Sequence, residues 1–128
     1  MDLNNNSKGQ IAQLKCQLRA AEKNIITSLP LVPARYDLAL DIDNKIIRAQ
    51  IKYCDAKDHS KNTLILRLER KHLGQKSYDK NDIDLLLVFI PRIDKVLVFY
   101  PNQFHKISKI RINLKNPKSY NYWGKFIW

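Results

Sequence analysis

Apolar side chains recur every three to four residues near the start of the chain, between Ser7 and Asn24. The repeating positions are Ile11, Leu14, Leu18 and Ala21. This spacing predicts an amphipathic helix with one buried face. Ser7 and Gln10 also fit a capping box, in which Ser7 is the N-cap and Gln10 the third helical residue. We therefore expect the helix to begin at Ser7 and to end near Asn24.

The rest of the chain alternates between apolar and polar side chains, which is typical of strands. The expected strands span residues 36–42, 45–53, 63–69, 84–90, 95–100 and 107–114, and a proline-broken edge strand or connector spans 25–32. Residues 71–82 read as a loop with at most one helical turn, and residues 102–105 as another helical turn. A helix followed by strands predicts an α/β or α+β fold, with a mixed central sheet and flanking helices.

Alternation also predicts which side chains share a face in the first two full strands, which a turn at Asp43 and Asn44 joins. One face should carry Tyr36, Leu38, Leu40 and Ile42 with Ile47, Ala49, Ile51 and Tyr53, and the other Asp37, Arg48, Gln50 and Lys52. The apolar set should be buried. The polar set is either a solvated sheet face or a place where chemistry is done.

Length and cysteine content place the chain among single-domain intracellular proteins. Its 128 residues suffice for one buried core, and we expect one domain, with a core at 7–101 and a basic, aromatic extension at 102–128. Cys16 and Cys54 lack the spacing of metal ligands and read as reduced thiols. The longest apolar run, 85–90, is too short to cross a bilayer, so we expect a cytoplasmic protein with no membrane partner.

Charge narrows the class of partner. The net charge is +11, and it rises along the chain from zero over residues 1–44 to +4 over 45–91 and +7 over 92–128. A basic chain of this kind favours a polyanion as its partner, most often nucleic acid. The alternative is a basic but inert protein.

The polar face of the first two strands meets the needs of phosphodiester hydrolysis. That reaction needs a metal ion, a group that positions water, and a cation that meets the developing charge. Mg²⁺ takes oxygen ligands and uses few carboxylates. Asp37 on one strand, with Gln50 and Lys52 on the next, supplies these groups from one side.

The helix opening Gly9-Gln10-Ile11-Ala12, the segment ARYDLALD at 34–41 and the segment AQIKYC at 49–54 together resemble the PD-(D/E)xK nuclease superfamily. More narrowly, they resemble its small homing endonucleases encoded by group I introns of cyanobacteria. The resemblance is close over residues 7–53 and looser over 78–101. It implies a PD-(D/E)xK core and a bacterial, cytoplasmic nuclease that uses Mg²⁺ or Mn²⁺.

The resemblance also assigns roles to residues. Asp37 would be the metal-binding acid, Gln50 would replace the usual Asp or Glu, Ile51 would add its backbone carbonyl, and Lys52 would orient the nucleophile. The family pattern has Glu on the leading helix where this chain has Gln10, so Gln10 would be a neutral fourth member of the site. Its alternative role is that of a helix cap.

Basic side chains outside this site form an expected DNA track, although any single one reads equally well as a solvated residue. These are Lys57, Lys61, Arg67, Arg70, Lys71, Lys106, Lys109 and Arg111. The resemblance implies a homotetramer, favoured over a dimer, acting on double-stranded DNA with a pseudo-palindromic target. A resolvase of four-way DNA junctions and a non-catalytic DNA-binding protein of the same fold are the alternatives.

Overall fold

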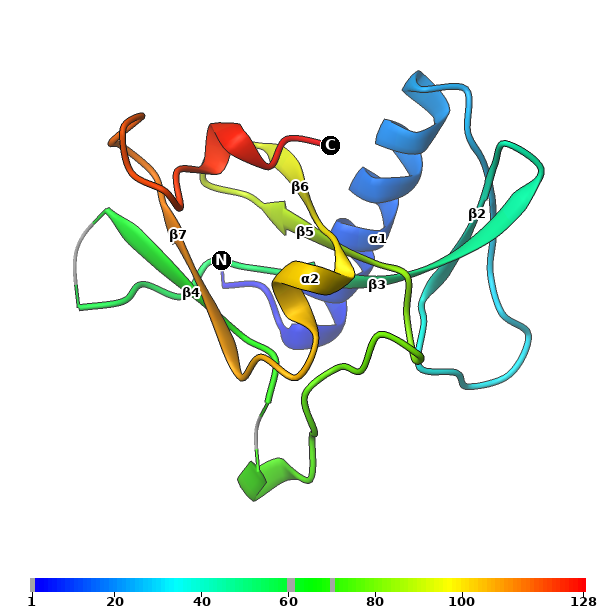
Figure 1. Ribbon diagram of the computed structural model, residues 1–128, viewed down its shortest axis with the longest axis horizontal. Helices are drawn as coiled ribbons and strands as arrows, with labels where there is room; N and C mark the ends of the chain where they lie inside the picture. Colours follow the sequence, from blue (N-terminus) through cyan, green and yellow to red (C-terminus); the bar gives the residue numbers. More distant parts are fainter. Residues whose placement is uncertain (1, 60–61, 70) are drawn as a thin grey trace.

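A five-stranded mixed sheet separates two apolar layers in the computed structural model, which describes residues 2–59, 62–69 and 71–128 (Figure 1). The sheet has the order β1-β2-β3-β5-β6, and all its neighbours are antiparallel except β3 and β5. Its strands are β1 (Ile26–Ser28), β2 (Leu38–Ile42), β3 (Lys45–Tyr53), β5 (Leu85–Ile90) and β6 (Lys95–Phe99). The predicted fold class is therefore confirmed.

Helix α1 (Asn5–Glu22) covers one face of the sheet, and a two-stranded ribbon of β4 (Thr63–Arg67) and β7 (Lys109–Asn113) packs on the other. The short helix α2 (Pro101–Phe104) precedes β7, and single 3₁₀ turns lie at Lys71–Leu73 and Trp123–Lys125. No helix in the described part of the chain is long and apolar enough to cross a bilayer.

The buried face of α1 differs from the predicted one. Ala12, Cys16 and Ala20 are fully buried, whereas the predicted core residues Leu14 and Leu18 are more than half exposed. The helix turns its small side chains to the sheet because these let the helix and sheet backbones approach closely. The positions of the large apolar side chains therefore predicted the wrong inner face. The predicted N-cap is also wrong, because the Ser7 amide donates to the side chain of the true cap, Asn4, at 2.8 Å.

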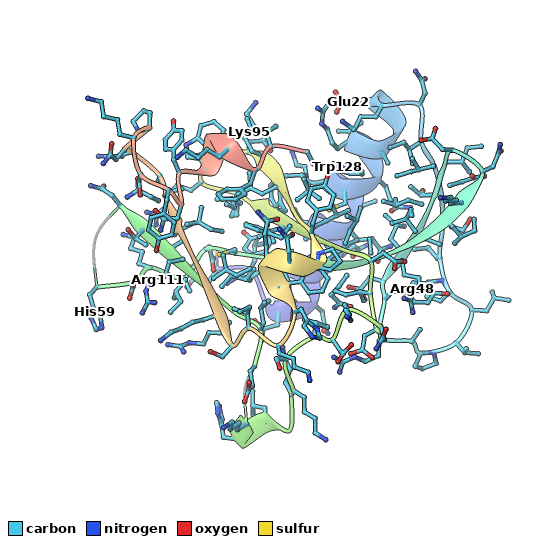
Figure 2. All side chains as sticks on the ribbon, viewed as in Figure 1. Glu22, Arg48, His59, Lys95, Arg111 and Trp128 are labelled. Carbon is cyan, nitrogen blue, oxygen red and sulfur yellow. The ribbon has the colours of Figure 1, made fainter. Side chains whose placement is uncertain are left out.

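The C-terminal residues are built into both layers. Trp128 is buried with α1, and its main-chain oxygen accepts a hydrogen bond from Arg19 Nε at 2.6 Å. Phe126 stacks on Phe99 of β6, and its carbonyl accepts from the Val98 amide. The aromatic tail thus pins the edge strand β6, and Figure 2 shows Trp128 near the C-terminal half of α1.

Candidate functional site

A β-bulge at the start of β2 sets the position of Asp37. Leu38 is the register partner of Ala49, yet the Asp37 amide also donates to the Ala49 carbonyl at 2.9 Å. Two residues therefore oppose one, which is the arrangement of a bulge. The extra residue reverses the face of the chain before it, so Tyr36 packs in the ribbon-side layer and not beside Leu38 as predicted.

The bulge directs the carboxylate of Asp37 at the next strand. Its Oδ2 accepts the Ile51 amide at 2.9 Å, so the side chain occupies the place that a main-chain carbonyl of β2 would otherwise take. Burial raises the pKa of Asp37, and this effect outweighs the Ile51 hydrogen bond and the nearby Lys52 charge, which both lower it. Asp37 is thus a half-buried carboxylate, and its hydrogen bond and the nearby lysine do not fully offset the cost of burying its negative charge.

Gln50 and Lys52 point to the ribbon side of the sheet, because the residues that alternate with them, Ala49 and Ile51, pack under α1. The Lys52 ammonium lies 5.4 Å from the ring centre of the buried Tyr78, and the Arg35 guanidinium lies 4.8 Å from the same ring. Burial raises the pKa of Tyr78 to about 12, so its ring stays neutral. One aromatic ring therefore holds two cations beside Asp37.

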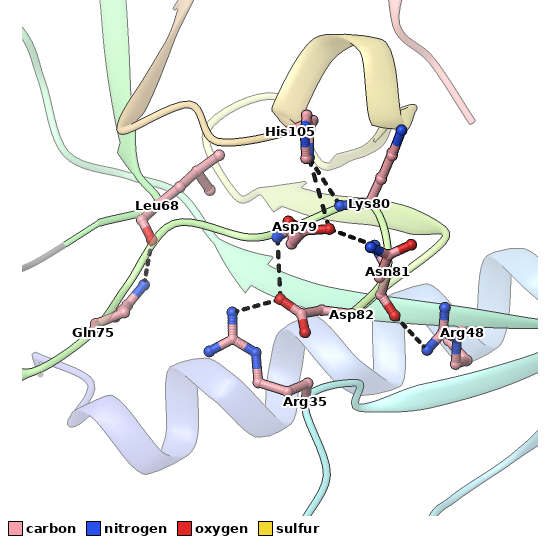
Figure 3. Close-up of polar contacts among 9 residues, drawn as sticks. All are labelled: Arg35, Arg48, Leu68, Gln75, Asp79, Lys80, Asn81, Asp82 and His105. Carbon is pink, nitrogen blue, oxygen red and sulfur yellow. Dashed lines mark hydrogen bonds and ion pairs between the residues drawn. The ribbon is translucent and has the colours of Figure 1, made fainter.

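The sequence did not single out Arg35 or Tyr78, because their contacts arise from a loop more than twenty residues after β3. Figure 3 shows how that loop is fastened: Asp82 accepts from Arg35 at 3.3 Å and from the Asp79 amide at 3.1 Å. Its far end is tied to β3, since Arg48 donates to the Asn81 carbonyl at 2.9 Å. These polar contacts bring Tyr78 over Lys52.

A cavity of about 340 Å³ opens beside Lys52 between α1, β3 and β4. Three basic residues line it, namely Lys8, Lys52 and Arg67. Lys8 is partly neutralised by Asp55, whose Oδ2 lies 3.4 Å from its Nζ. The cavity has the charge and the polar lining that suit a phosphate group.

Gln10 does not line this cavity, and its side chain is exposed. On α1, the Cys16 thiol feels the charge of Asp37: burial and, less strongly, this charge raise the pKa of Cys16 to about 12. The structure thus brings Asp37 to the Gln50–Lys52 stretch of β3 and leaves Gln10 exposed at the surface.

The atoms at the site that could bind a metal ion are all oxygens, and only one of the groups that carry them has a full negative charge. They are the Asp37 carboxylate, the Gln50 amide and the Ile51 carbonyl. Among residues 2–59, 62–69 and 71–128, no three His, Cys, Asp or Glu side chains form a group suited to a metal ion. The set fits Mg²⁺ or Mn²⁺, which take oxygen ligands and often keep several waters. It does not fit a thiolate- or imidazole-seeking metal.

The predicted DNA track is exposed where the structure describes it. Arg67, Lys109 and Arg111 lie on the ribbon, and Lys57 lies beside β4. Lys71 begins the 3₁₀ turn at Lys71–Leu73, and Lys106 lies in a loop. Lys61 and Arg70 fall outside the described residues. The ribbon therefore collects three of the predicted contacts on one element.

Comparison with known proteins decides the family. The model of the PD-(D/E)XK endonucleases matches residues 3–126. The chain belongs to this family. A bacterial homing endonuclease, I-Ssp6803I, has a similar solved structure, with a TM-score of 0.79 and 20% sequence identity over 98% of this chain and 89% of that chain.

This member of the PD-(D/E)XK endonuclease family therefore shares its fold with I-Ssp6803I over nearly its whole length. No curated protein matches the chain. Family membership confirms the predicted superfamily and makes DNA the expected substrate. The roles of Asp37, Gln50 and Lys52 stay predictions, since they rest on geometry and resemblance.

Proposed function

We propose that this chain is a site-specific endonuclease that hydrolyses DNA phosphodiester bonds with Mg²⁺ or Mn²⁺ and makes double-strand breaks as an intron homing endonuclease. The observation that carries the proposal is the grouping of Asp37, Gln50 and Lys52 at the bulged junction of β2 and β3. Family membership and the likeness to a bacterial homing endonuclease support it. The two reduced cysteines suit a bacterial cytoplasm.

Asp37, Gln50 and the Ile51 carbonyl would hold the metal, and Gln10 is the predicted further member of the set. When bound, the ion would polarise the scissile phosphate and lower the pKa of an attacking water. The raised pKa of Asp37 supports this assignment, because a bound cation would compensate the charge that burial disfavours.

Lys52 would hold the attacking water and meet the negative charge that develops on the phosphate. Its ammonium is kept in place by the Tyr78 ring, whose other neighbour, Arg35, adds a second positive charge near the site. Because the ring stays neutral at neutral pH, it competes for neither proton nor metal. Gln50 would orient water or a phosphate oxygen through its amide.

A chain with a single active site needs more than one copy to cut both DNA strands. We therefore propose a homo-oligomer that binds a pseudo-palindromic target, and we favour a tetramer over a dimer. Residues 25–34 support self-association. This stretch carries no charge in a chain of net +11, and it exposes Ile26, Leu29, Leu31 and Val32. Leu31 is fully exposed. Such an uncharged, apolar surface lets two strongly basic copies meet without repulsion.

The test is a cleavage assay on the intron-insertion DNA, with Lys52→Ala as the variant. The unaltered chain should cut in Mg²⁺ and not in EDTA, and Lys52→Ala should lose at least roughly a hundredfold in rate while it still binds the same DNA. A four-way junction serves as second substrate. Preference for the junction would favour a resolvase, and binding without any cleavage would favour a non-catalytic DNA-binding protein.

A further inference from the structure

The ribbon of β4 and β7 has one apolar and one basic face. Leu64, Leu66 and Ile112 point inward and are buried against the sheet. The residues between them face the other way in register, with Arg67 opposite Lys109 and Ile65 opposite Arg111. Ile65 is itself buried, whereas Arg67, Lys109 and Arg111 are exposed. The ribbon thus presents three exposed cations on this face.

The pair formed by Arg67 and Lys109 is unfavourable without a ligand. The two residues are direct cross-strand partners, both are exposed, and neither forms an ion pair with a described residue. Like charges placed directly opposite one another destabilise a strand pair. An anion lying over the ribbon would convert this repulsion into binding. A phosphate group is the anion that this protein family meets.

Arg111 is held differently. Its Nε donates to Asp58 Oδ2 at 2.7 Å, and the Asp58 side chain is only 16% exposed, whereas that of Arg111 is 43% exposed. The Arg111 hydrogen bond lowers the pKa of Asp58, with a smaller contribution from the His59 amide. Asp58 is itself fixed, since its amide donates to the Thr63 carbonyl at 2.8 Å. The guanidinium plane is therefore oriented, and its two terminal nitrogens form no hydrogen bond within the described part of the chain.

The ribbon adjoins the candidate catalytic site, because Arg67 at the end of β4 lines the same cavity as Lys52. Figure 2 shows Arg111 further along the ribbon, on the side away from Arg48. A two-stranded ribbon is narrow enough to enter the major groove, where an arginine fork pairs with O6 and N7 of guanine.

We infer that the β4–β7 ribbon lies in the major groove beside the scissile phosphate, where Arg111 reads a guanine and Arg67 and Lys109 grip backbone phosphates. The inference rests on the proposed DNA endonuclease function. Asp58 acts as a positioning residue, because it sets the plane of the Arg111 fork. The ribbon thereby couples sequence reading to the cavity that holds Lys52.

The experiment selects bound DNA from a library of about 30 base pairs with a randomised target, in Ca²⁺ to prevent cleavage. Arg111→Ala should relax preference at one guanine per half-site and weaken the selected target roughly ten- to hundredfold, with little change on random DNA. Arg111→Lys keeps the charge and should relax the same position. Lys109→Ala should weaken all sequences alike and reduce the salt slope by about one.

Lys45→Ala removes one charge from the distant β2–β3 hairpin and is the matched control, with no expected change in preference. Equal loss on selected and random DNA in Arg111→Ala and Arg111→Lys would overturn the inference, since Arg111 would then be a phosphate contact. An unchanged preference in both would overturn it too. If the unaltered chain binds no DNA, the proposed function itself fails. The variants alone test only the role of the ribbon, so the two failures can be told apart.

Discussion

Replacing Asp37 by Asn should make the protein more stable and inactive at once. The asparagine oxygen still accepts the Ile51 amide, so the 2.9 Å bond at the bulge is kept and only the charge is lost. Burial raises the pKa of Asp37, which means that the folded state disfavours the charged form. The penalty is present at neutral pH and vanishes at low pH, where the carboxyl is protonated in both folded and unfolded states.

The magnitude follows from the half-buried position of the side chain. Solvent screening keeps the cost of the charge small, and relief of this cost at a functional site adds about 0.5–1 kcal/mol to the free energy of unfolding. For a domain of this size that gain is about 2–4 °C in Tm. Cleavage should fall by at least roughly a hundredfold, because the only carboxylate among the predicted ligands is gone.

Asp84→Asn is the matched control, because the fold lowers the pKa of Asp84 whereas it raises that of Asp37. Burial alone would raise the pKa of Asp84, but hydrogen bonds from the Arg48 side chain and main chain lower it overall. Asp84 Oδ2 accepts the Arg48 amide at 2.8 Å and Nε at 3.2 Å. With solvent screening included, loss of this carboxylate should cost about 1 kcal/mol at pH 7, and the cost should fade as pH falls through the folded pKa.

The assay is thermal unfolding of the chain and both variants from pH 7 to pH 3. The two variants should lie on opposite sides of the unaltered chain at pH 7 and converge with it at low pH. A less stable Asp37→Asn whose deficit persists at pH 3 would refute the reasoning, because Asp37 would then serve the fold by its shape. Retained cleavage in that variant would remove Asp37 from the site.

Three further predictions concern binding, assembly and the leading helix. DNA affinity should fall roughly 10³-fold between 50 and 200 mM salt if six or more phosphates are contacted, and a flat response in a filter-binding titration would contradict this. Leu31→Lys should shift the chain to smaller oligomers in light scattering, whereas exposed Leu73→Lys should not. Gln10→Glu should raise Mg²⁺-dependent cleavage at least roughly tenfold, because it adds a carboxylate where the family pattern has Glu. Unchanged cleavage in this variant would leave Gln10 as a surface residue of α1.

Much of the sheet could be predicted from the sequence because its signals are local. The bounds of β3 follow from alternation and agree with the structure at both ends. The apolar face of Ile47, Ala49, Ile51 and Tyr53 is confirmed as well, since all four pack on the α1 side. Alternation alone is therefore enough to place Gln50 and Lys52 on a common face.

The errors arise where tertiary contacts override periodicity. A bulge adds one residue to β2, and nothing in the spacing of Tyr36 and Leu38 reveals it. Helix α1 buries Ala12, Cys16 and Ala20, whose small size hides them from a search for large apolar residues. The ribbon pairs β4 with β7 across more than forty residues, a pairing that local patterns do not encode.

The scarcity of acids at the site affects how metal and DNA bind. Asp37 is the single carboxylate among the predicted ligands, and the cations Lys52, Arg35 and Lys8 lie around it or line the adjoining cavity. A divalent cation approaching the free protein meets net repulsion, whereas one arriving with a phosphate brings the missing negative charge with it. By linkage, each ligand then raises the affinity for the other by the same factor. We therefore expect weak metal binding to the free chain and much tighter binding once DNA fills the cavity, which limits hydrolysis to the bound target. Equal Ca²⁺ affinities with and without target DNA, measured by calorimetric titration, would contradict this expectation.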